Sequence, residues 1–146
     1  AAVAVAGVMG ERTLFQYDPG RLTTVTTVNP VQALAATRFG PIAVELDIVG
    51  LASVVWRFTG ETGWKVMEGY PVTSPVLALA AFGDGFVYSG LNGAINVYDP
   101  QIGFCPPVAG RLGIYDVRSV AALGTSIAAA GFDASGAAAL VIATPK

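Results

Sequence analysis

Short apolar segments separated by glycine-containing turns follow one another along the chain, most simply in the stretch from Ala78 to Gly103. Three apolar runs lie in and beside this stretch: Val76 to Phe82, Phe86 to Leu91 and Ala94 to Tyr98. The turns between them are Gly83-Asp84-Gly85 and Asn92-Gly93. Both central residues of a type I′ turn need positive φ, which Asn and Gly tolerate best, so these turns indicate β-hairpins. The pattern predicts an antiparallel meander of short strands.

Approximate copies of this meander lie on both sides of it. The first strands align as Val31 to Ala36, Val76 to Ala81 and Val117 to Ala122, at offsets of 45 and 41 residues. Such offsets are the period of four-stranded repeat units. The third strands end at Tyr17-Asp18-Pro19, Phe58-Thr59-Gly60 and Tyr98-Asp99-Pro100. We therefore predict a single all-β domain of roughly fourteen strands over residues 1–146. Its units are a partial unit 1–30, two full units 31–74 and 75–116, and a partial unit 117–146.

The same pattern places the remaining strands. In the first full unit they are expected at Ile42 to Leu51, Ser53 to Phe58 and Trp64 to Tyr70. The fourth strand of the second full unit is expected near Arg111 to Tyr115. No helix of ordinary length is predicted, because Gly131 and Gly136 interrupt the alanine-rich segment 129–139.

Composition narrows the classes of partner. The chain is 53% hydrophobic and only 12% charged, against a usual charged fraction of about 25%. The net charge is −2 and the eight basic residues are scattered, so no nucleic-acid face is expected. The apolar segment Ala1 to Gly10 is too short to span a bilayer, which takes about 20 residues, and it lacks the basic flank of a signal peptide. We expect no membrane partner. The sequence leaves the location open, and a cytoplasmic or virion-associated location is the most compatible with it.

Several chemistries are excluded by absent residues. The chain has no histidine, so it cannot alone build a Ser-His-Asp or Cys-His arrangement or the usual catalytic zinc site. Cys105 is the single cysteine, which excludes an intrachain disulfide, and no activating base is indicated beside it. We expect no cofactor, no metal and no catalytic residue.

Two acidic residues have useful spacing. Glu45 and Asp47 are two residues apart on a predicted strand and would share a face, as paired carboxylates or calcium ligands would. We expect instead a solvated strand face or one that protects a sheet edge, because charges on edges discourage unwanted pairing. Asp18, Asp84 and Asp99 each stand beside Pro or Gly, where turn formation explains them.

Aromatic residues form the other candidate site. Tyr17, Phe58 and Tyr98 recur at equivalent positions, so we expect them to pack between neighbouring units. Trp64 and Tyr70 do not recur. Together with Glu45 and Asp47, they are the residues predicted to contact a partner or a glycan.

The repeated third-strand endings resemble those of β-propeller blades of the WD40-like, kelch-like and quinoprotein-like groups. The resemblance extends over almost the whole chain, but no Trp-Asp pair, Gly-His pair or kelch double glycine assigns a subfamily. It implies a β-propeller-like array of four-stranded antiparallel meanders. About three and a half blades make an incomplete ring, since four to eight usually close one. The resemblance therefore implies either a piece of a longer polypeptide or a ring completed by other protein chains.

A non-catalytic structural or protein-interaction module follows as the expected function, such as a subunit or fragment of a virion or another multi-protein complex. One alternative is a carbohydrate-binding, lectin-like propeller, which would repeat aromatic and Asp or Asn groups in each unit. Another is a fragment of a propeller enzyme, which would contribute carboxylates to a site completed by missing blades. A different all-β fold, such as a sandwich, is the remaining alternative.

Overall fold

The computed structural model describes residues 4–7, 11–47, 52–60, 63–67, 76–90, 93–105 and 113–144, and only the backbone of residues 4–7, 18, 47, 52 and 90. Fourteen β-strands and no helix lie in these ranges, so the predicted all-β fold is confirmed. No helix in the described ranges is long and apolar enough to cross a membrane.

The strands form four antiparallel sheets in chain order, and within each sheet every strand pairs with the next one in sequence. Sheet 1 holds β1 (Ala4–Gly7), β2 (Thr13–Asp18) and β3 (Arg21–Thr26). Sheet 2 holds β4 (Val31–Thr37), β5 (Gly40–Asp47), β6 (Ala52–Thr59) and β7 (Gly63–Val66). Sheet 3 holds β8 (Val76–Phe82), β9 (Gly85–Gly90), β10 (Ile95–Asp99) and β11 (Gly103–Phe104). Sheet 4 holds β12 (Asp116–Leu123), β13 (Ser126–Phe132) and β14 (Ala138–Ala143).

A β-bulge recurs at the same place in three sheets. The pairing register shifts between Val31 and Ala33 in β4, between Val76 and Ala78 in β8, and between Val117 and Ser119 in β12. These are equivalent positions of the sequence repeat. A bulge bends and twists its strand, so the three units share a backbone distortion as well as a sequence pattern.

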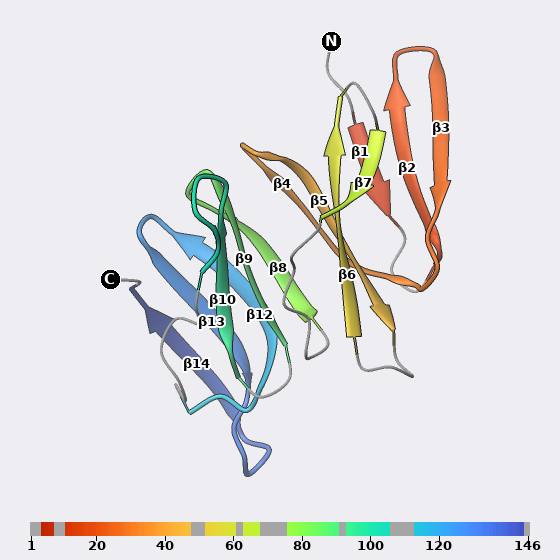
Figure 1. The fold of residues 1–146 in the computed structure, drawn as a ribbon. Coiled ribbons are helices and arrows are strands. Elements are labelled where there is room, and N and C mark those ends of the chain that lie inside the picture. Colours follow the sequence, from red (N-terminus) through yellow and green to blue (C-terminus); the bar gives the residue numbers. More distant parts are fainter. Residues whose placement is uncertain are drawn as a thin grey trace.

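The sheets stack face to face in chain order (Figure 1). A hydrophobic cluster fills each of the three spaces between consecutive sheets. Leu14 of sheet 1 packs with Ala43 of sheet 2, Val55 of sheet 2 with Phe86 of sheet 3, and Ile95 of sheet 3 with Val117 of sheet 4. The first strands of the three later sheets also contact one another in turn, β4 with β8 and β8 with β12.

One strand prediction is wrong. The fourth strand of the second full unit is β11, Gly103–Phe104, whereas the described residues 113–115 carry no strand. The Asp99 side chain accepts a hydrogen bond from the Gln101 amide at 2.7 Å, which confirms the predicted turn role of Asp99. Gly103 then adopts a φ of +86°, so the chain reverses at once and pairs with β10.

Candidate functional site

Four equivalent residues, one on the third strand of each repeat unit, differ in their exposure to solvent. In the partial first unit this third strand is β2. The repeat aligns Leu14 on β2, Val55 on β6, Ile95 on β10 and Leu140 on β14. Leu14 is 0% exposed, and Val55 and Ile95 are each 1% exposed, because each faces the next sheet. Leu140 is 72% exposed. The face that buries its side chains in sheets 1 to 3 is therefore open in sheet 4.

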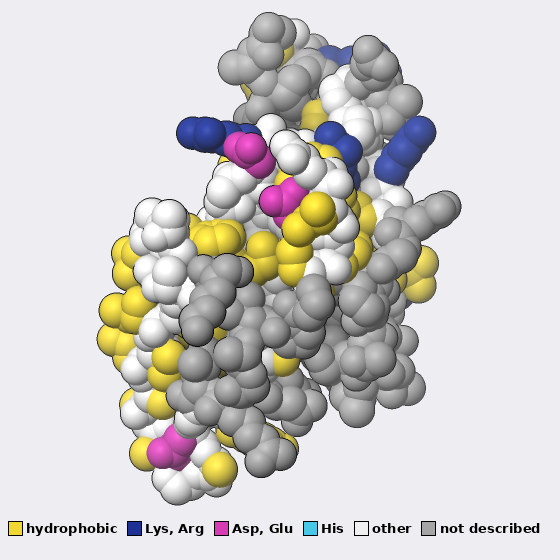
Figure 2. Space-filling model, turned by 60° about the vertical axis from the view of Figure 1, so that its left-hand side comes forward, with side chains coloured by type: hydrophobic (Ala, Val, Ile, Leu, Met, Phe, Trp, Pro, Cys, Tyr) yellow, Lys and Arg dark blue, Asp and Glu magenta, His cyan; other side chains and the backbone are white. Residues whose placement is uncertain are grey.

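The central part of this open face of sheet 4 is apolar. Cross-strand pairing places Ala130 beside Ser119 and Leu140, Ala128 beside Ala121 and Ile142, and Phe132 beside Asp116 and Ala138. We call these residues together with Leu123, which follows Ser119 and Ala121 on the same face of β12, the C-terminal end face. Four of its side chains are large and exposed: Leu123, Phe132, Leu140 and Ile142. Figure 2 shows hydrophobic side chains along the left edge of its view, with an acidic side chain near the lower end and Lys and Arg in the upper part.

Sheet 1 is open on its other face, the one that points away from sheet 2. Tyr17 on β2 pairs with Leu22 on β3, and these side chains are 51% and 63% exposed. The equivalent pair in sheet 2, Phe58 and Trp64, is only 5% and 6% exposed, because it faces sheet 1. Phe15 and Thr24 pair on the same face of sheet 1 as Tyr17 and Leu22. We call these four residues the N-terminal end face.

The prediction that Tyr17, Phe58 and Tyr98 pack between units therefore has a different outcome in different sheets. Phe58 packs between sheets 1 and 2, and Tyr98 packs between sheets 2 and 3, where its ring contacts Phe86 and Phe104. Tyr17 does not pack between units, because the described residues place no sheet against its face. The prediction is thus right for two of the three rings and wrong for Tyr17.

Trp64 and Tyr70 were the aromatic contacts expected at the surface. Trp64 lies in the cluster between sheets 1 and 2, edge-on to Phe58 with ring centroids 5.5 Å apart. Its indole nitrogen is buried and has no hydrogen-bond partner among the described residues. Tyr70 lies outside the described residues. A partner would reach Trp64 only if the two sheets separated, so the contact role of both residues stays a prediction.

Glu45 is buried, with 1% of its surface exposed. It lies on β5, an interior strand of sheet 2, so the expectation of a solvated or edge-protecting position is wrong for Glu45. Its carboxylate accepts hydrogen bonds from the backbone N–H of Asn29 at 3.0 Å and from the indole N–H of Trp56. Asp47 pairs with Ala52 through the backbone. No other acidic side chain is described beside Glu45, and its contact role stays a prediction.

The Glu45 carboxylate holds the segment that joins sheets 1 and 2. In sheet 4 the corresponding amide, that of Tyr115, donates instead to the backbone carbonyl of Phe132 at 2.8 Å. The residue equivalent to Glu45 there is Gly131, where an added Cβ would lie 1.9 Å from the Asp116 carbonyl oxygen. In sheet 2 the Glu45 side chain thus accepts the hydrogen bond that a backbone carbonyl accepts in sheet 4. The spacing of residues in the sequence did not reveal Asn29 and Trp56 as partners of Glu45.

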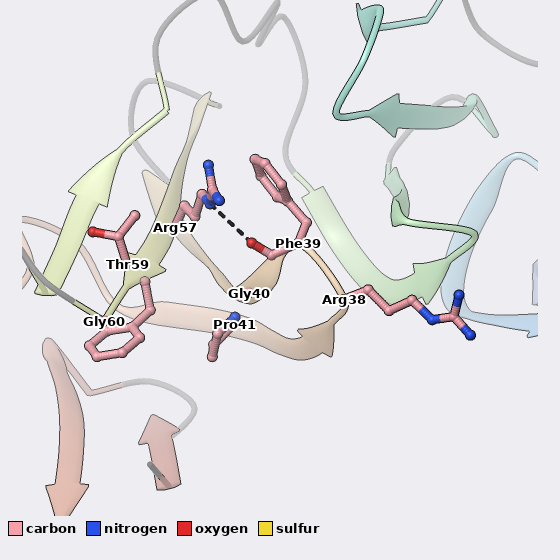
Figure 3. A pocket seen from close by; sticks show the side chains of 8 residues that line it. Arg38, Phe39, Gly40, Pro41, Arg57, Thr59 and Gly60 are labelled. Carbon is pink, nitrogen blue, oxygen red and sulfur yellow. Dashed lines mark hydrogen bonds between the residues drawn. The ribbon is translucent and has the colours of Figure 1, made fainter. Parts of the chain in front are cut away.

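A groove of about 550 Å³ opens at the turn between β4 and β5 and the end of β6. The Arg57 guanidinium lies 3.4 Å from the centre of the Phe39 ring, and its Nε donates to the Phe39 carbonyl oxygen at 3.2 Å (Figure 3). Arg38 points away from this pair and meets Asp84 at the surface. The Arg57 contacts join β6 to the turn before β5, which indicates a structural role.

Asp133 organises the turn between β13 and β14. Its carboxylate accepts hydrogen bonds from the Ser135 hydroxyl, the Ser135 amide and the Ala137 amide. These bonds, the Ser135 hydroxyl first, lower the pKa of Asp133 below its ordinary value of 3.8. Across the described ranges, no group of three His, Cys, Asp or Glu side chains could hold a metal ion.

No protein-family model matches this chain, and no curated protein matches it significantly. Solved structures do resemble it. The crystal structure of the computationally designed Ika4 protein has a TM-score of 0.70 at 18% identity, over 99% of this chain and 86% of that one. A luciferin-regenerating enzyme has a TM-score of 0.57 at 13% identity, over 89% of this chain and 50% of the enzyme. At these identities the likeness shows a shared fold alone.

Proposed function

We propose that this chain is a non-catalytic protein-interaction module of the β-propeller type and a subunit or fragment of a larger assembly. The observation that carries the proposal is the C-terminal end face, where Leu140 and Ile142 are 72% and 63% exposed. A Leu or Ile side chain gains about 1.5–3 kcal/mol when it is fully buried. Contiguous exposed apolar faces of this kind mark interaction sites in soluble proteins.

The propeller arrangement is supported by the order of the sheets. Meander sheets stacked in chain order, with the first strands β4, β8 and β12 in contact, suit a radial array around these strands. The recurring bulge gives the three later units the same local geometry. In such an array each sheet is covered on both faces by neighbouring sheets, so an open end face needs another sheet against it.

A non-catalytic role is supported by the chemistry of the described residues. Glu45, the one acidic residue in the core of the part that the structure describes, accepts hydrogen bonds from Asn29 and Trp56. Asp99 and Asp133 serve turns. Trp64, which a lectin-like function would need at the surface, is buried. These observations favour the interaction module over the carbohydrate-binding and enzymatic alternatives.

Binding of an apolar dye to dilute protein tests the proposal. The wild-type chain should bind the dye strongly, and Leu140→Asp combined with Ile142→Asp should abolish most of the signal without loss of the β-type circular dichroism spectrum. Ile102→Asp is the matched control, because Ile102 is 77% exposed but lies in the turn between β10 and β11. Equal dye binding by all three proteins would contradict the proposal.

A further inference from the structure

We propose that the partner at the C-terminal end face is a second copy of this chain, which presents its N-terminal end face. This inference rests on the proposed function and adds the identity of the partner. The two copies associate head to tail, sheet 4 of one against sheet 1 of the other.

The first argument is that the chain already builds this interface three times. In each internal interface, one sheet contributes an aliphatic residue of its third strand toward the next sheet: Leu14, Val55 and Ile95. Leu140 occupies the fourth of these equivalent positions and is exposed. The C-terminal end face therefore corresponds to one side of such an interface. No described residue of the same chain supplies the other side.

The second argument is that the N-terminal end face supplies the missing half. In sheet 2 the face toward sheet 1 carries the Phe58–Trp64 pair, and in sheet 3 the face toward sheet 2 carries the Tyr98–Phe104 pair. Tyr17 and Leu22 form the equivalent pair in sheet 1 and are 51% and 63% exposed. A second copy would cover them in the way that sheet 1 covers Phe58 and Trp64.

The third argument is electrostatic. The C-terminal end face consists of apolar residues, Ser119 and Asp116, and the N-terminal end face of Phe15, Tyr17, Leu22 and Thr24. Asp116 is the one charged residue in the two sets, and Arg118 pairs with its carboxylate at 2.6 Å, so their contact would desolvate no unpaired charge. Head-to-tail contacts close into a ring when the rotation permits it. Two copies contribute four sheets each, and a ring of eight lies within the usual range of about four to eight blades.

The proposal is tested by molar mass measurements on the full chain and on two end-face variants. The wild-type chain should have twice the mass of the 14.9 kDa monomer. Leu140→Asp removes one half of the interface and Leu22→Asp the other, so each variant alone should be monomeric, with self-affinity weakened about a hundredfold or more. Ile102→Asp should remain a dimer. Circular dichroism confirms that each variant is folded.

Mixing the two variants gives the decisive result. Leu140→Asp keeps an intact N-terminal end face and Leu22→Asp keeps an intact C-terminal end face, so an equimolar mixture should recover a heterodimer held by one interface. If Leu22→Asp dimerises alone, two C-terminal end faces pair with each other, and the proposed head-to-tail interface is wrong. If neither variant changes a wild-type dimer, the contact lies elsewhere and the proposal also fails.

The outcomes also separate this inference from the proposed function. A monomeric wild-type chain whose dye binding is lost in Leu140→Asp overturns the second copy as partner but leaves an interaction face. A chain whose mass and dye binding are both insensitive to Leu140 overturns the inference and the proposed function together.

Discussion

The two middle sheets and the two end sheets carry similar side chains at equivalent positions but bury them differently. Val55 and Ile95 are each 1% exposed in sheets 2 and 3, whereas Leu140 is 72% exposed in sheet 4. The residue types alone do not cause this difference, because all three are branched aliphatic residues. The difference arises from the presence or absence of a neighbouring sheet. Each end sheet therefore has the residues of an interface on one face, but no described sheet of the same chain packs against that face.

The largest expected effect compares Ile95 with Leu140. Ile95→Ala should lower the free energy of unfolding by about 2–5 kcal/mol, because it leaves a cavity between sheets 3 and 4. Leu140→Ala should cost the monomer less than about 0.5 kcal/mol, as for other surface substitutions. Urea denaturation at a dilution where the chain is monomeric measures both. Equal costs would show that the two positions are equally buried in the monomer, against the present comparison.

The next effect compares Gly85 with Ser126, the first residues of β9 and β13. A Cβ added at Gly85 would lie 1.9 Å from the Tyr98 carbonyl oxygen, whereas the Ser126 hydroxyl meets that of Thr144 at the surface. Gly85→Ala should therefore destabilise by about 1–3 kcal/mol through overpacking. Ser126→Ala should cost less than about 0.5 kcal/mol. Thermal unfolding monitored by circular dichroism compares them, and a mild Gly85→Ala would contradict the close strand approach in sheet 3.

The next comparison is between sheet 2, where the Glu45 side chain accepts hydrogen bonds from Asn29 and Trp56, and sheet 4, where Gly131 occupies the equivalent position. Glu45→Ala should lower the free energy of unfolding by about 1–3 kcal/mol, because it leaves the half-buried N–H donors of Asn29 and Trp56 without an acceptor. Glu45→Gln keeps an acceptor oxygen and should be the milder change. Chemical denaturation of both variants tests this order. If Glu45→Gln cost as much as Glu45→Ala, the retained acceptor oxygen would contribute nothing, and the carboxylate charge, which both variants lack, would be the important feature.

The smallest effect concerns the exposed turn of sheet 4. The pKa of Asp133 is lowered by hydrogen bonds from Ser135 and Ala137, so the folded turn favours the ionised carboxylate. Its contribution is present above the unfolded value of 3.8 and is lost as pH falls through the lower folded pKa. Amide hydrogen exchange of Ser135 and Ala137, corrected for intrinsic rates, should accelerate on acidification in the wild type but not in Asp133→Ala. Identical pH profiles would rule out this turn role.

The strand order could be predicted from the sequence because turn chemistry and the repeat are local signals. Val76–Phe82 agrees residue for residue, and the bounds of most other strands lie within a few residues of the prediction. The two-residue strand β11 was missed, because Gly103 returns the chain too soon for an apolar run to form. The bulges also left no signal, since an extra residue on one strand is visible only in its pairing.

The burial of individual residues was harder to predict. Glu45 was expected on a solvated or edge-protecting strand face because charges on edges discourage unwanted pairing, but donors from Asn29 and Trp56 satisfy it in the core. Trp64 was expected at the surface because it does not recur, although Phe104 occupies the equivalent position with another aromatic ring. Tyr17 was expected to pack between units because it does recur. Burial depends on which sheet lies opposite, and the repeat pattern holds no information on that.

Hydroxyl-radical footprinting of the wild-type chain tests the central claim most directly, because it reports the solvent accessibility of individual side chains. At a concentration where the chain is dimeric, Leu140, Tyr17 and Leu22 should be protected, and dilution should restore their reactivity. Ile102, also exposed in the monomer, should react equally at both concentrations. If Leu140 and Tyr17 showed no concentration-dependent protection, the two end faces would not be halves of one interface.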